Sequence, residues 1–503
     1  MSPVNRVTIV AYILLLSMSL IIPFGFCYTC PQSERRGIWY ETEYRVSPDP
    51  IIGNNTLWND FSFYAEYNIT SIYFLVNENY VFYNSSVAPM HPNYNWDVLK
   101  DACKIAEHFN LSIHAWIVVF RDYYLWNQNS TIRVVDINGS TSGAEDWINP
   151  AIREVRDYKL SIINEIIRNY DVKGVHLDYI RYPDDRYSYD NYSRTVFTSE
   201  YGFDPKDNPN AQEWYEWRCT QITSFVNETK ILVKSFNPQL EVSCAVMPTT
   251  GSRIWHLQNW EEWANEHLVD YLMTMSYTAD ITEFENWVKN STQAIDKKVG
   301  LMVGIGIFLY ADWQNRSDIL QKQWNMVRKG DCEGWVLFRD EFLYYFTDAL
   351  KHPPELSEPW QDPPANNVQP FQNVVVSVNA TYYLVGFKDV TLWYSLDNGT
   401  SWTILNMTEL PSTAITYEAV IGGYENCTWV TYKIVAYDSA GNKTTKDNNG
   451  YGYQYHVIPE FLSTSILILL MLTTLIATTL WKTKRKRQPR IFPLLKSYSF
   501  SRC

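Results

Sequence analysis

The segment YDVKGVHLDYIRYPDD (residues 170–185) decides how this sequence is interpreted. Within it, residues 174–180 form a short, largely apolar run that ends three residues before Pro183. Such a run is typical of a strand that is buried on both faces of a parallel sheet. Alternation along this strand places His176 and Asp178 on one face. A buried aspartate is costly unless it is paired or used, so Asp178 is a candidate for chemistry, with an ion pair to Arg181 as the structural alternative.

Seven further runs of this kind occur along the chain, and periodic helical segments such as 96–109, 154–170 and 318–329 lie between them. Eight β/α units predict a (β/α)₈ barrel over residues 33–351. A doubly wound sheet is the alternative, but no Gly-rich phosphate-binding loop follows the first strand. The expected strands are 36–40, 70–76, 112–119, 174–180, 241–247, 269–277, 299–308 and 333–338.

A different pattern follows the predicted barrel. Residues 352–370 contain six of the 23 prolines and predict a stiff linker. Residues 371–456 consist of β-rich runs separated by Asp-Asn-Gly and Ser-Ala-Gly turns. They resemble a β-sandwich of the immunoglobulin or fibronectin type III kind, whose expected role is spacing, with glycan binding as the alternative. The expected fold class is therefore α/β, a (β/α)₈ barrel with a C-terminal β-sandwich. A single transmembrane helix is expected beyond the sandwich, at residues 461–481.

The two ends of the chain predict export and anchoring. Residues 1–28 carry one charge and a long apolar run, which indicates a secretory signal peptide or, alternatively, an uncleaved signal anchor. Residues 461–481 are uncharged and long enough to span a membrane. The basic tail, residues 482–503, predicts a cytoplasmic C-terminus and an extracellular N-terminal region at the cell surface. The motif IPEF at 458–461 is similar to sorting signals at which such an anchor is cleaved.

Composition limits the partners. The chain has 42 Lys and Arg against 55 Asp and Glu, and its net charge of −13 argues against nucleic acid. The aromatic content of 16% suits a protein that handles sugars, and many Asn-x-Ser/Thr sequons predict a glycoprotein. The scattered cysteines leave room for one or two disulfides, whereas no metal site and no cofactor are indicated. The oligomeric state stays open.

Several motifs follow one another in order along the predicted barrel. They are RRGIWY (35–40), HAW (114–116), VHLDYIRYP (175–183), DYLMTMSY (270–277) and GWVLFRDE (334–341). This order closely resembles the glycosyl hydrolase-like 10 family of exported proteins. The resemblance implies a (β/α)₈ barrel that hydrolyses glycosidic bonds, and it does not extend to the predicted sandwich or the C-terminal span.

Glycosidic cleavage usually takes two carboxyl groups, one as acid and the other as nucleophile or base. We expect Asp178 to be the nucleophile or base, because it lies at the end of a central strand. We expect Glu341 to be its partner, with Asp280 second and with Glu78 and Asp340 as further alternatives.

A substrate-assisted mechanism is a second possibility for the chemistry. The sixth expected strand ends in MSYTAD and is loosely similar to the Met-x-Tyr strand of chitinase-type barrels. In that mechanism the N-acetyl group of the substrate is the nucleophile, and Tyr277 would steady the intermediate.

Sugar sites pair flat aromatic rings with charged or amide hydrogen-bonding groups. The side chains expected to bind substrate lie at or near predicted strand ends. They are His114, Trp116, Arg121, His176, Tyr179, Arg181, Asp280, Arg339 and Asp340.

The sequence thus predicts a surface-anchored glycoside hydrolase that acts on extracellular or cell-envelope polysaccharide through carboxylate acid/base chemistry. The alternative is a non-catalytic glycan-binding or surface-layer protein on a barrel scaffold.

Overall fold

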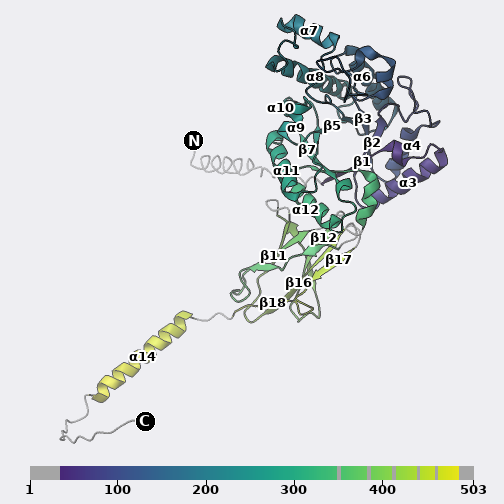
Figure 1. Ribbon diagram of the computed structural model, residues 1–503. Helices are drawn as coiled ribbons and strands as arrows, with labels where there is room; N and C mark the ends of the chain where they lie inside the picture. Colours follow the sequence, from purple (N-terminus) through teal and green to yellow (C-terminus); the bar gives the residue numbers. More distant parts are fainter. Residues whose placement is uncertain are drawn as a thin grey trace, which may run out of the picture.

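Eight parallel strands close into a barrel in the order in which they occur along the chain (Figure 1). The computed structural model describes residues 34–347, 353–381, 387–410, 415–438, 442–458 and 463–485. Each barrel strand overlaps one expected run, so the (β/α)₈ prediction is confirmed. The strands are β1 (Arg35–Tyr40), β2 (Ser71–Asn77), β3 (Ser112–Val118), β4 (Gly174–Asp178), β5 (Glu241–Val246), β6 (Tyr271–Met275), β7 (Gly300–Gly306) and β8 (Gly334–Phe338).

The apolar runs arise because the barrel strands are buried on both faces. All residues of β2 and β4 are buried. One set of side chains packs against the surrounding helices in the main core, and the other set fills the inside of the barrel. The inner set is unusually bulky and consists of Trp39, Tyr73, Leu75, Trp116, Val118, Met273, Met302 and Val336.

Helices surround the strands (Figure 1). Several begin at an aspartate whose carboxylate accepts a backbone N–H of the first turn, as at Asp97, Asp190 and Asp280. The helices of the barrel are α2 (Thr42–Arg45), α3 (Pro50–Glu66), α4 (Val98–His108), α5 (Tyr123–Gln128), α6 (Arg153–Asn169), α7 (Asn191–Tyr201), α8 (Gln212–Phe236), α9 (Thr250–Trp255), α10 (Trp260–Asn265), α11 (Ile281–Ile295) and α12 (Arg316–Lys329).

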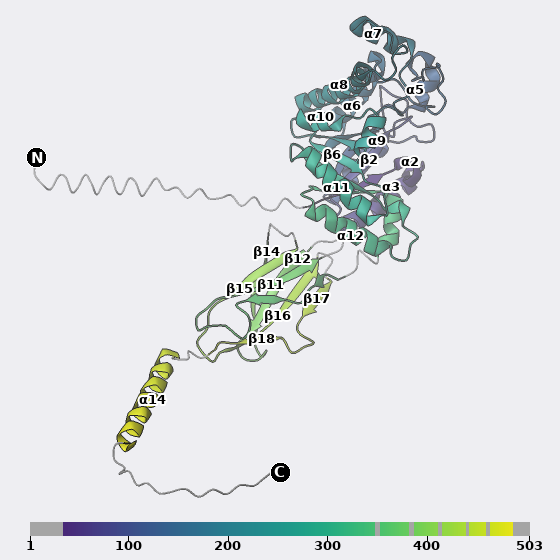
Figure 2. The same ribbon diagram turned by 60° about the vertical axis from the view of Figure 1, so that its left-hand side comes forward.

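Antiparallel sheets follow the barrel (Figure 2). One sheet has the order β10-β11-β15-β14, and the other has the order β13-β12-β16-β17, with β18 paired to β16. The two share a hydrophobic core, which is consistent with the predicted sandwich. The strands are β9 (Glu355–Leu356), β10 (Trp360–Asp362), β11 (Val374–Thr381), β12 (Phe387–Ser395), β13 (Thr403–Asn406), β14 (Thr408–Glu409), β15 (Thr416–Ile421), β16 (Trp429–Asp438), β17 (Lys443–Lys446) and β18 (Tyr453–His456).

The segment predicted as a linker, residues 352–370, differs from the expectation. Its strands β9 and β10 both pair with β11, so part of this segment belongs to the sandwich. Prolines do not prevent this, because they are tolerated at sheet edges and strand ends. The segment therefore completes a sheet in addition to joining the two domains.

The predicted signal peptide, residues 1–28, and residues 486–503 of the basic tail lie outside the described residues. Helix α14 (Ser463–Arg485) overlaps the expected span at 461–481. The predicted transmembrane helix is not supported, since no helix among the described residues combines the length and the apolar character needed to cross a membrane.

Candidate active site

Asp178 is the last residue of β4, at the C-terminal end of the barrel, which we call the mouth. Its side chain is buried, and Oδ1 accepts the Tyr179 backbone N–H at 2.6 Å. Arg181 Nη1 lies 3.5 Å from the same oxygen. Burial raises the pKa of Asp178, while Arg181, the Tyr179 amide and Trp116 act in the opposite direction. The carboxylate is therefore desolvated but only loosely paired, as a reacting group needs to be.

Tyr179 adopts a left-handed backbone conformation, with φ of 49°. This conformation is rare for a bulky side chain and is typical of functional sites. Two guanidinium groups lie near the centre of the Tyr179 ring, that of Arg181 at 4.4 Å and that of Arg121 at 5.3 Å. The ring of Trp147 lies 5.6 Å away. The strained residue therefore directs its N–H at Asp178 and its ring at the two arginines.

Carboxylates accompany the arginines of the mouth. Arg121 is paired with Asp146 at 2.9 Å and lies 3.6 Å from Glu78, which follows β2. Arg339, which follows β8, pairs with Glu341 at 2.5 Å and with one further carboxylate. Because each guanidinium already has an acidic neighbour, the arginines do not make a free cationic patch.

That further carboxylate is Glu41, a residue that the sequence reasoning missed. It follows β1 directly, and its carboxylate accepts a hydrogen bond from Arg339. Burial raises the pKa of Glu41, Arg339 opposes this shift, and the negative charges of Glu341 and Asp178 add to it. Glu41 and Asp178 are thus close enough for their charges to interact. The available signal was its position directly after RRGIWY, the same relation to a strand that selected Glu78.

Aromatic rings line the interior next to Asp178. Tyr277, two residues beyond β6, stacks on Phe338 with centroids 5.3 Å apart and meets Trp39 edge-on at 6.3 Å. Burial raises the pKa of Tyr277 well above its usual value, and the Asp178 charge adds to the shift. The hydroxyl of Tyr277 is therefore neutral, and it lies close enough to Asp178 for the carboxylate charge to act on it.

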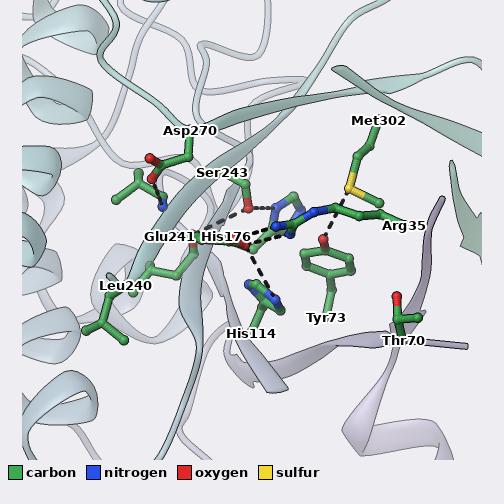
Figure 3. A network of polar contacts seen from close by, with 12 residues as sticks. Arg35, Thr70, Tyr73, His114, His176, Leu240, Glu241, Ser243, Asp270 and Met302 are labelled. Atoms are coloured by element: carbon green, nitrogen blue, oxygen red, sulfur yellow. Dashed lines mark hydrogen bonds and ion pairs between the residues drawn. The ribbon is translucent and has the colours of Figure 1, made fainter. Parts of the chain in front are cut away.

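The two histidines lie deeper in the barrel than expected. His176 accepts the Trp39 indole N–H through Nε2 at 2.9 Å, and its Nδ1 lies 2.9 Å from the Ser243 hydroxyl. Burial lowers its pKa to about 3, so the ring is neutral. His114 lies beside Tyr73 near the N-terminal end (Figure 3). Its pKa is lowered to about 4, again by burial.

Two of the predicted acidic residues also lie away from Asp178. Asp340 is buried on the outer side of the barrel, where Arg45 Nε approaches it at 2.8 Å, and burial raises its pKa to about 8. Asp280 is exposed and caps α11 by accepting the Glu283 backbone N–H at 2.9 Å.

Ten side chains gather at or just beneath the mouth around Asp178. They are Asp178, Trp116, Tyr179, Arg181, Tyr277, Arg121, Arg339, Glu341, Glu78 and Glu41.

Neither a metal-binding cluster nor a disulfide is present in the described part of the chain. No group of three or more His, Cys, Asp or Glu side chains there is arranged to hold a metal ion. Five described cysteines are free thiols, namely Cys103, Cys219, Cys244, Cys332 and Cys427. None of these five cysteines therefore forms a disulfide, although the sequence allows one or two.

The closed barrel of eight parallel strands defines a (β/α)₈-barrel protein, and acidic side chains lie at the mouth of this barrel. A family model described as glycosyl hydrolase-like 10 matches residues 34–325, more than half of the chain. The chain therefore belongs to the glycosyl hydrolase-like 10 family.

Two curated relatives match part of the chain. An S-layer-related protein of Niallia circulans is 25% identical over 240 residues, which cover 37% of this chain and 15% of the relative. Glycosyl hydrolase YngK of Bacillus subtilis (strain 168) is 22% identical over 201 residues, which cover 33% of this chain and 36% of the relative. The chain thus spans about a third or less of the length of these relatives.

Two solved structures share the barrel fold. The glycoside hydrolase domain of PgaB (BpsB) from Bordetella bronchiseptica superposes with a TM-score of 0.51 at 14% identity, covering 63% of this chain and 97% of that one. Alpha-L-fucosidase isoenzyme 2 from Paenibacillus thiaminolyticus also gives 0.51, at 13% identity, covering 63% and 49%. At these identities the likeness supports the fold alone.

Proposed function

We propose that this protein is a glycoside hydrolase that cleaves O-glycosidic bonds of extracellular or cell-envelope polysaccharide. The observation that carries the proposal is the buried carboxylate of Asp178 at the C-terminal end of a central barrel strand. Active sites of such barrels lie at this end. Membership of the glycosyl hydrolase-like 10 family supports the same class of reaction.

Asp178 acts in this proposal as nucleophile or base. Two carboxylates flank the opposite side of the mouth, Glu41 and the predicted Glu341, and both bind Arg339. Glu41 is the better general acid because its side chain is only 15% exposed, against 33% for Glu341. Burial raises the pKa of Glu41, which is the direction that a general acid requires, because the acid must hold a proton before it transfers it to the leaving-group oxygen.

Substrate binding is assigned to the rings and guanidinium groups around Asp178. The half-buried Tyr179 ring offers a face for the C–H side of a pyranose, Trp116 packs inside the barrel beneath the mouth, and Arg121 and Arg181 offer N–H donors to the sugar hydroxyls. Tyr277 lies near enough to Asp178 for the two to act together. They could therefore support the substrate-assisted route if the sugar carries an N-acetyl group. Both routes use Asp178.

Asp178→Asn is the variant that tests this proposal. The full chain and the variant are incubated with a panel of soluble polysaccharides, and new reducing ends are measured. We expect the variant to lose ~10²-fold or more in kcat/KM, which is at least ~2.7 kcal/mol of transition-state stabilisation.

Asp184→Asn is the matched control, because Asp184 is a buried aspartate of the same loop that pairs with Arg186 at 2.6 Å. This control is expected to keep wild-type activity. Equal activity in the wild type and Asp178→Asn would contradict the assignment of Asp178.

A non-catalytic glycan-binding protein is the second candidate. The ion pair of Asp178 with Arg181 and the likeness to an S-layer-related protein favour it. Glycan binding without new reducing ends in the same panel would select this candidate.

We also propose that the barrel works outside the cell. The segment at residues 1–28 and the sequons support export. Mass analysis of the mature protein should find an N-terminus after the signal peptide and glycan on asparagines of the sequons. An unprocessed, unmodified chain would contradict export by this route.

A further inference from the structure

One face of a sandwich sheet carries aromatic and lysine side chains. In the sheet β13-β12-β16-β17, Trp393 of β12 is paired with Lys433 of β16, and Tyr437 of β16 is paired with Lys443 of β17. Paired residues lie on the same face, and so do positions four apart on one strand. The intervening positions of β12 and β16 supply the sandwich core. These four side chains therefore share the outer face of the sheet.

The two lysines lie over the rings of this face. Lys433 Nζ is 4.1 Å from the ring centroid of Trp402 and 5.1 Å from that of Trp393. Lys443 Nζ is 5.7 Å from the centroid of Tyr437. Within the described parts of the chain, neither ammonium group has a carboxylate partner within 4.0 Å. Asp389 of β12 is paired with Tyr437 and shares this face, so the face carries two ammonium groups and one carboxylate in a chain with a net charge of −13.

A further ring extends the face along β16. Trp429 lies four residues before Lys433, and 59% of it is exposed. Its ring is 4.6 Å from that of His456 on β18, with which it is paired. We call the set Trp393, Trp402, Trp429, Lys433, Tyr437 and Lys443 the aromatic face.

The chemistry of the aromatic face suits a sugar that bears a negative charge. Indole and phenol rings pack against the apolar C–H side of a pyranose. An ammonium group lying over those rings can meet a carboxylate on the same sugar and gain a charge-assisted hydrogen bond. A neutral glycan would use the rings alone, and a cationic one would be repelled by both lysines.

We propose that the aromatic face binds an acidic polysaccharide of the uronic-acid type, with the pyranose rings against Trp393 and Trp402 and a carboxylate at Lys433. This binding does not depend on hydrolysis at the barrel, so either proposal can fail alone. In the full chain, the face would hold the barrel close to a carboxylate-bearing matrix.

Affinity electrophoresis of the full chain carrying Asp178→Asn tests the proposal, because this background removes the proposed cleavage. Native gels contain alginate as the polyuronate, dextran as the neutral glycan, or glycol chitosan as the cationic one. We expect alginate to retard the protein most strongly. Trp393→Ala and Lys433→Gln should each weaken retardation by alginate about tenfold, or ~1.4 kcal/mol, and Lys433→Arg should restore most of it.

Trp360→Ala is the matched control, since Trp360 is 46% exposed but lies on β10 of the other sheet. It should leave retardation unchanged. Thermal unfolding identifies any variant that fails to fold, and Lys433→Gln then decides, because Lys433 is half-buried on the face of the sheet that points away from the sandwich core. Absence of retardation by alginate would overturn the proposal. Equal retardation by dextran, unaffected by Lys433→Gln, or equal losses in Trp360→Ala would also overturn it.

Discussion

The mouth of the barrel and its N-terminal end both contain polar side chains, but they use them differently. At the N-terminal end, Arg35 donates through both Nη atoms to the two carboxylate oxygens of Glu241, at 2.9 and 2.7 Å (Figure 3). The guanidinium also lies 4.3 Å from the centre of the Tyr271 ring. At the mouth, Asp178 has one guanidinium nitrogen at 3.5 Å and a raised pKa.

The difference separates polar groups that hold the fold from those that can react. A bidentate pair satisfies its charges and leaves little for a ligand. A desolvated carboxylate that is only partly compensated, next to a residue in a strained conformation, retains capacity for a substrate. Variants at the mouth should therefore change activity at nearly constant stability, and variants at the N-terminal end should do the reverse.

The largest expected effect concerns the second carboxyl of the mouth. Glu41→Gln should lower kcat/KM by ~10²–10⁴-fold, the contribution expected of a general acid, and Glu341→Gln should lower it by less than about tenfold. Arg339 binds both residues, so each variant keeps one of its partners. Initial rates on the substrate found by the glycan panel provide the measurement. A larger loss in Glu341→Gln than in Glu41→Gln would assign the role of general acid to Glu341.

A smaller effect is expected at the N-terminal end. Arg35→Gln removes the bidentate partner of the partly buried Glu241 and should lower the free energy of unfolding by about 1–2 kcal/mol. Catalytic rates should stay within about twofold of the wild type. Arg153→Gln is the matched control, because the side chain of Arg153 is 52% exposed and its ion pairs contribute little. Urea unfolding of the three proteins measures the difference, and a loss of activity in Arg35→Gln would break the comparison.

Near neutral pH the smallest effect is that of His114, which appears as a loss of stability at the same end when the pH is lowered. Burial lowers the pKa of His114 to about 4, whereas the unfolded chain has the ordinary value near 6.5. The unfolded state therefore binds the proton first as the pH falls, so stability is lost between pH ~6.5 and ~4, by at most about 1.4 kcal/mol per pH unit.

His114→Gln should show a shallower fall of unfolding free energy over this window. His108→Gln, at an exposed position at the end of α4, is the matched control and should keep the wild-type slope. Identical slopes in all three proteins would show that His114 does not titrate on unfolding.

The same contrast explains which parts of the molecule can be predicted from the sequence. The eight barrel strands were predictable because burial on both faces produces continuous apolar runs, and Asp178 because an acid interrupts one of them. Strand periodicity gives the face of a residue but not its depth. His176 shares the face of Asp178, yet it lies one layer lower, where Trp39 and Ser243 satisfy both of its nitrogens.

The other differences have physical reasons of their own. Glu41 is the single residue between β1 and α2 and stands in a polar stretch, so its sequence context does not distinguish it from a surface acid. Asp340 follows a strand end as Glu41 does, but its side chain turns outward to Arg45. The strands β9 and β10 are two and three residues long and stand next to prolines, so they leave no periodic signal.

The central claim is that the mouth reacts and the N-terminal end holds the fold, and one paired measurement tests it most directly. Initial rates and unfolding free energies are measured side by side for Asp178→Asn and Arg35→Gln. The account predicts that Asp178→Asn loses ~10²-fold or more in rate while its stability changes by less than about 1 kcal/mol. It predicts the reverse for Arg35→Gln. Unchanged rates in Asp178→Asn, or parallel losses of rate and stability in both variants, would contradict it.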